Sequence, residues 1–129
     1  MRSLVRLSAP QYFSLSYHNE QLERETDVTF DEYQAAAART MNPRLTEAEQ
    51  LLDAAAGTAE EAGEVLAHVR KHVYQERTLD REKLAEELGD VLWCVAATAT
   101  ASGLKLEDIA ALNTHKLARR WPDGMPSNR

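Results

Sequence analysis

The chain has 129 residues, of which 43% are hydrophobic and 28% charged, and its formal net charge is −6 at pH 7. This length and balance are typical of one soluble globular domain. An acidic surface makes nucleic acid and anionic membranes poor partners, and no stretch reaches the roughly 18 apolar residues of a membrane span.

Residues 1–27 lack the apolar segment of a secretory signal. We expect them to form a poorly ordered N-terminal arm or to result from an upstream translation start. One domain over residues 28–124 and a C-terminal tail, residues 125–129, would follow. The single cysteine, Cys94, excludes an internal disulfide and fits a reducing cytoplasm. Its apolar neighbours predict a buried side chain rather than a nucleophile, which would need a basic partner.

The first two predicted helices each begin at a threonine that starts a capping box, with a glutamate three residues later. The first follows Thr29 and ends before Pro43, because the residue before a proline avoids the α region. The second follows Thr46 and runs to about Gln75. Its apolar residues recur at helical spacing and predict an inward-facing stripe: Leu51, Ala55, Ala62, Leu66, Val69 and Val73.

Two more helices complete an all-α fold. The third follows Asp80 and ends at Gly103, and the fourth runs from about Leu106 to Trp121. Residues 91–101 are apolar or small on nearly every side, so the third helix needs neighbours on two faces. We therefore predict an antiparallel bundle of about four helices that is completed by oligomerisation. The inward stripes of these helices are Leu84, Leu88, Val91, Leu92, Val95 and Ala99, then Ile109, Leu112 and Leu117.

Two acidic segments stand out, one on the second predicted helix and one on the third. Each has two carboxylates at spacing i, i+3, which share a helix face: Glu61 with Glu64, and Glu87 with Asp90. An antiparallel hairpin would bring the pairs together, and converging carboxylates repel one another unless a cation lies between them. Oxygen ligands alone favour Mg²⁺ or Mn²⁺. The alternative is a solvated acidic face, since such pairs are common on helices.

A polyphosphate substrate would also require positive charge near these acids. Asn113, Lys116 and Arg120 recur at spacings of three and four, so they share one face of the fourth helix, and Lys71 lies beyond the acids on the second. Lysine and arginine on rigid helices can hold phosphate oxygens. For Lys71, compensation of the helix dipole is an equal reading.

These motifs resemble the MazG-like family of all-α nucleotide pyrophosphohydrolases. The segments 60–64 (Glu-Glu-Ala-Gly-Glu) and 87–90 (Glu-Leu-Gly-Asp) are similar to the family pattern E-E-x-x-E followed by E-x-x-D. Residues 113–124 are similar to a further family segment, and the resemblance covers roughly residues 28–124.

The resemblance implies a Mg²⁺-dependent enzyme that cleaves (d)NTPs between the α and β phosphates, in cytoplasmic house-cleaning of the nucleotide pool by a homodimer or homotetramer. It implies four metal ligands: Glu61, Glu64, Glu87 and Asp90. It makes Glu60 the general base or a residue that orients water, and Asn113, Lys116 and Arg120 the phosphate contacts. A phosphoribosyl-ATP pyrophosphohydrolase shares the acid pattern, and a non-catalytic helical oligomerisation module is an alternative from another class.

Overall fold

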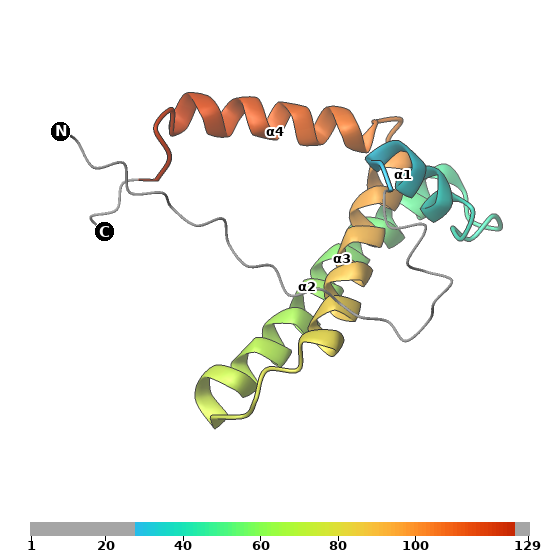
Figure 1. The fold of residues 1–129 in the computed structure, drawn as a ribbon. Coiled ribbons are helices and arrows are strands. Elements are labelled where there is room, and N and C mark those ends of the chain that lie inside the picture. The colour runs from blue at the N-terminus through green and yellow to red at the C-terminus, as the bar shows by residue number, and fades with distance from the viewer. Residues whose placement is uncertain (1–27, 126–129) are drawn as a thin grey trace.

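The computed structural model describes residues 28–125, and within this range the chain forms four helices and no strand (Figure 1). They are α1 (Phe30–Ala38), α2 (Glu47–Gln75), α3 (Arg81–Ala101) and α4 (Leu106–Arg120). The predicted all-α bundle is therefore confirmed. The predicted arm, and all but the first residue of the predicted tail, lie outside the described residues. Among the described helices, none combines the length and apolar character needed to cross a membrane.

The helix boundaries follow from local hydrogen bonds that the sequence predicts. Thr29 and Thr46 each accept a hydrogen bond from the backbone of the glutamate three residues later, whose carboxylate accepts one from the threonine backbone in return. Asp80 accepts a hydrogen bond of 3.0 Å from the backbone N–H of Lys83 and begins α3. Gly103 follows α3 with φ at 68°, a conformation that glycine adopts without strain.

Helices α2 and α3 form an antiparallel hairpin, which is the most extensive helix–helix contact in the described chain (Figure 1). Small side chains line it: Ala54 on α2 and Cys94 on α3 are both buried. A Cβ atom added to Gly57 would lie 2.9 Å from the Sγ atom of Cys94, so this glycine allows the two helices to approach closely. The predicted burial of Cys94 is confirmed.

Helix α1 covers a second side of α3. Ala37 of α1, Ala96 of α3 and Leu106 of α4 form a small buried cluster, with Trp93 packed against it. The indole N–H of Trp93 donates a hydrogen bond of 2.7 Å to Thr40 Oγ1. The face of α3 that carries Trp93 therefore has a partner within the chain. The oligomer itself stays a prediction.

Gln34 holds the start of α4 against α1. Its Oε1 atom accepts a hydrogen bond of 2.7 Å from the backbone N–H of Leu106, and its Nε2 atom donates one of 2.9 Å to the carbonyl of Leu104. Beyond this point α4 extends away from the hairpin (Figure 1). Leu112 and Leu117 are 71% and 48% exposed, so the prediction that they face inward is wrong for the single chain.

The apolar stripe predicted on α2 is also largely exposed. Most of the stripe predicted on α3 is at least partly covered, since Ala99 is buried and Leu84, Val91 and Val95 are intermediate. Leu66 and Val73 on α2 are 59% and 58% exposed, and Leu88 on α3 is 51% exposed. The side of α2 that meets α3 carries the smaller Ala54 and Gly57 instead. The prediction of an inward-facing stripe is therefore wrong for α2 within the single chain, because helical periodicity identifies an apolar face without identifying what covers it.

Replacing Gly57 by alanine is expected to lower the melting temperature, because the added methyl group has to displace the buried Sγ atom of Cys94. Overpacking of this kind costs about 1–3 kcal/mol, against a gain of about 1 kcal/mol in helix propensity. Gly63→Ala is the matched control in the same helix, since its added Cβ would meet no described atom within 4 Å apart from its chain neighbours and the backbone of its own helix. Gly63→Ala should raise the melting temperature, measured by circular dichroism. An equal rise in both variants would contradict the close contact between Gly57 and Cys94.

Candidate active site

The hairpin brings three of the predicted metal ligands together. Glu61 of α2 and Glu87 and Asp90 of α3 each contribute a carboxylate oxygen, and these oxygens lie within 4.8 Å of one another. The i, i+3 spacing places Glu87 and Asp90 on one face of α3, and the antiparallel pairing places Glu61 opposite them. Glu64 is exposed and is not part of this group. Metal binding by the four acids stays a prediction.

Crowding of like charges makes this cluster electrostatically unfavourable without a cation. Loss of water on burial raises the pKa of the Glu61 carboxyl, and the neighbouring charges of Asp90, Glu60 and Glu87 raise it further. A divalent cation among the three carboxylates would relieve this repulsion. Because the group contains only oxygen ligands, it suits Mg²⁺ or Mn²⁺ better than zinc or copper.

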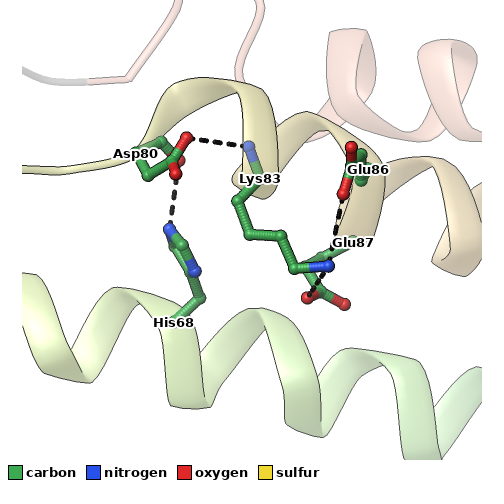
Figure 2. Close-up of polar contacts among 5 residues, drawn as sticks. All are labelled: His68, Asp80, Lys83, Glu86 and Glu87. Carbon is green, nitrogen blue, oxygen red and sulfur yellow. Dashed lines mark hydrogen bonds and ion pairs between the residues drawn. The ribbon is translucent and has the colours of Figure 1, made fainter.

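Lys83 supplies the nearest positive charge to the cluster. Its Nζ atom lies 3.2 Å from Glu87 Oε1 and 3.2 Å from Glu86 Oε2 (Figure 2). The Glu87 side chain is only 12% exposed, so its pair with Lys83 is screened less than a surface pair. Hydrogen bonds to Glu87 and Glu86 raise the pKa of Lys83 above its usual range.

Two open pockets adjoin the carboxylates, one on each side along the hairpin. The turn pocket, about 420 Å³, lies toward the α2–α3 turn; its lining includes Glu64, His68, Lys71, Arg77, Lys83 and Glu87. The tryptophan pocket, about 260 Å³, lies toward α1; its lining includes Asp53, Glu60, Glu61, Asp90, Trp93 and Cys94. Burial raises the pKa of the Cys94 thiol, and nearby acids raise it further, so it is not an activated nucleophile.

The predicted phosphate contacts fall into two groups. Lys71 lines the turn pocket, beside the carboxylates. Asn113, Lys116 and Arg120 are exposed on α4, and they line neither the turn pocket nor the tryptophan pocket. The guanidinium of Arg120 lies over the ring of the adjacent Trp121, 5.5 Å from its centroid. Within one chain, α4 therefore does not bring its basic residues to the carboxylates.

Sequence reasoning missed two cations beside the acids, Lys83 and Arg77. Lys83 stands four residues before Glu87, a spacing at which a lysine and a glutamate pair on one helix face. That signal was available in the sequence. Arg77 lies in the turn between the helices, where no periodicity indicates a direction, and only the folded hairpin places it in the turn pocket.

An all-oxygen carboxylate cluster beside a pocket that contains lysine and arginine suits an enzyme that acts on phosphate esters or anhydrides with a divalent cation. A family model, the MazG nucleotide pyrophosphohydrolase domain, matches residues 49–125. This match spans more than half of the chain and includes both acidic segments, and the chain belongs to this family. No curated protein and no solved structure matches it.

Proposed function

We propose that the protein is a Mg²⁺-dependent nucleoside triphosphate pyrophosphohydrolase, for which Mn²⁺ can substitute. It would add water across the α–β anhydride of a (d)NTP and release a nucleoside monophosphate and pyrophosphate. The observation that carries the proposal is the convergence of Glu61, Glu87 and Asp90 across the hairpin, in a chain of the MazG family. A house-cleaning role in the cytoplasm, where nucleoside triphosphates are made and used, completes the proposal.

The residues of the chain would have three roles: metal ligand, orientation or deprotonation of water, and phosphate contact. Glu61, Glu87 and Asp90, joined by Glu64 from the next turn of α2, would hold the cation, which when bound would offset the charge of the phosphates. Glu60 lines the tryptophan pocket next to Glu61 and would orient or deprotonate the attacking water. The remaining assignments are phosphate contacts: Lys71, Asn113, Lys116 and Arg120.

A homodimer or homotetramer would complete the site. Leu66, Val73 and Leu88 expose more than half of their surfaces, and an assembly built on the hairpin would cover this apolar surface. Helix α4 extends away from the carboxylates of its own chain (Figure 1). In an assembly built on the hairpin, Lys116 and Arg120 of one copy would reach the phosphates bound by another.

The decisive experiment is a panel of canonical and modified (d)NTPs, together with phosphoribosyl-ATP, assayed with Mg²⁺ for pyrophosphate and orthophosphate separately. We expect pyrophosphate from at least one (d)NTP, complete loss of release in excess EDTA, and recovery when Mg²⁺ or Mn²⁺ is added back. Orthophosphate as the only product would refute α–β cleavage. Turnover of phosphoribosyl-ATP alone would identify a different substrate class.

A further inference from the structure

The two pockets beside the carboxylates differ in charge, although they adjoin the same cluster. The tryptophan pocket has four carboxylates in its lining, from Asp53, Glu60, Glu61 and Asp90, and no lysine or arginine. The turn pocket combines the carboxylates of its lining with three cationic side chains, those of Lys71, Arg77 and Lys83. A chain of phosphates that extends from the bound cation would be repelled on the first side. On the second side it would meet three cations, which balance the carboxylates of Glu64, Asp80 and Glu87.

We propose that the turn pocket binds the β and γ phosphates of the substrate, the part released as pyrophosphate, and that Lys83 and Arg77 contact their oxygens. This inference rests on the proposed function, and it adds a direction: the phosphates point along the hairpin toward the α2–α3 turn. Neither Lys83 nor Arg77 belongs to the acidic motifs or to the basic face of α4.

Lys83 lies beside the carboxylate cluster, where a phosphate bound next to the cation would need a hydrogen-bond donor. An ammonium group has three N–H donors, and the two carboxylates of Glu86 and Glu87 occupy two of them. The side chain reaches into the space between α2 and α3, beside Glu87 (Figure 2). The third donor remains for a phosphate oxygen, and Glu87, which Lys83 contacts, belongs to the carboxylate cluster.

Arg77 and Lys71 carry charge that no carboxylate of the described chain neutralises. Neither side chain forms a salt bridge with a carboxylate of residues 28–125, whereas Lys83 pairs with Glu86 and Glu87. An arginine fork matches the geometry of phosphate oxygens, and a lysine adds a point charge. Two cations without a salt bridge to a described carboxylate, in a pocket that Glu87 of the cluster also lines, suit a polyanion.

Two histidines of α2 fix the turn that carries Arg77. A backbone carbonyl only accepts hydrogen bonds, so His68 Nε2 donates to the carbonyl of Asp80 at 3.0 Å, and His72 Nδ1 donates to the carbonyl of Arg77 at 2.6 Å. Figure 2 shows the first of these bonds, from α2 to the start of α3. The turn is therefore tied to α2 at both of its ends, which keeps the pocket open beside the cluster.

Inorganic pyrophosphate is the probe for this pocket. Its affinity for the full-length protein in Mg²⁺, measured by titration calorimetry and as product inhibition, should fall about tenfold in Lys83→Met and in Arg77→Met, since each loses a hydrogen bond between charged groups. Inhibition by the nucleoside monophosphate should not change. The matched control is Lys105→Met, which removes the same charge before α4, outside both pockets.

Lys83 either contacts phosphate directly or acts only by positioning Glu87. The Mg²⁺ affinity of the variants, measured without nucleotide, distinguishes these two roles. Lys83→Met should leave it unchanged or tighter, because a competing cation is gone. Weaker Mg²⁺ binding with unchanged pyrophosphate affinity would overturn the role of Lys83, and unchanged pyrophosphate affinity in both variants would overturn the turn pocket. Because pyrophosphate binding is measured without turnover, a wild type that hydrolyses no triphosphate would remove the proposed function and still leave this test decisive.

Discussion

Glu61→Gln and Asp90→Asn are each expected to abolish pyrophosphate release, with a loss of at least about a hundredfold in kcat/KM. Residues that only orient a metal ligand already cost 10–100-fold when replaced, so loss of a ligand should cost at least as much. Both residues lie in the carboxylate cluster, and each amide keeps the shape of the side chain while removing its charge. Titration calorimetry should show weaker Mg²⁺ binding in both variants.

Glu61→Gln is expected to stabilise the metal-free protein, although it abolishes the activity of the metal-bound one. The raised pKa of Glu61 means that the folded state binds this proton more tightly than the unfolded chain does. Stability therefore falls as the pH rises from the usual range of a glutamate carboxyl through the pKa of the folded state. Glu61→Gln removes this loss, so its melting temperature at pH 7 in EDTA should exceed that of the wild type.

Glu82→Gln is the matched control, an exposed glutamate of α3 outside the cluster and outside the described salt bridges. It should keep both activity and Mg²⁺ affinity. If Glu61→Gln and Asp90→Asn were as active as this control, the cluster would not be catalytic. If they were inactive because they failed to fold, the melting curves would show it.

Leu66→Asp combined with Leu88→Asp is expected to dissociate the proposed oligomer. Both leucines are more than half exposed in the single chain, and a buried hot-spot side chain contributes about 2 kcal/mol or more to an interface. Each substitution acts twice in a two-fold symmetric dimer. Association should weaken at least a hundredfold, measured by light scattering after size-exclusion chromatography.

Val28→Asp is the control for this loss of association. Val28 is 58% exposed, almost the same as Leu66 at 59%, but it precedes α1 and lies outside the hairpin. It should leave the oligomer intact. A wild type that is monomeric at micromolar concentration, yet fully active, would contradict both the assembly and the shared site.

Mixing two inactive variants would test whether copies share a site. Glu61→Gln lacks a cluster carboxylate, and Lys116→Met lacks a predicted phosphate contact on α4. If α4 of one copy serves the cluster of another, a mixed dimer contains one site with both residues intact, and mixing should restore a part of the activity. No recovery after proven subunit exchange would mean that α4 does not act across the interface.

The sequence by itself determined the helices and the acidic motifs. Capping at Thr29, Thr46 and Asp80 depends on hydrogen bonds within one turn, so local residues suffice to place these helix starts. The pairing of Glu87 with Asp90 on one face likewise follows from helical geometry alone. Even the contact of Lys83 with Glu87 was present as a spacing of four.

Only the tertiary structure decided which faces are covered and which charges meet. The side of α2 that meets α3 is the one with Ala54 and Gly57, because small side chains allow close approach, and the larger Leu66 is left exposed. Glu61 lies in the carboxylate cluster, whereas Glu64 does not. Arg77 lines the turn pocket because the two helices of the hairpin pair and place the turn between them beside this pocket. Periodicity records the direction of each side chain relative to its own helix axis, whereas the position of the next helix depends on packing between residues far apart in the chain.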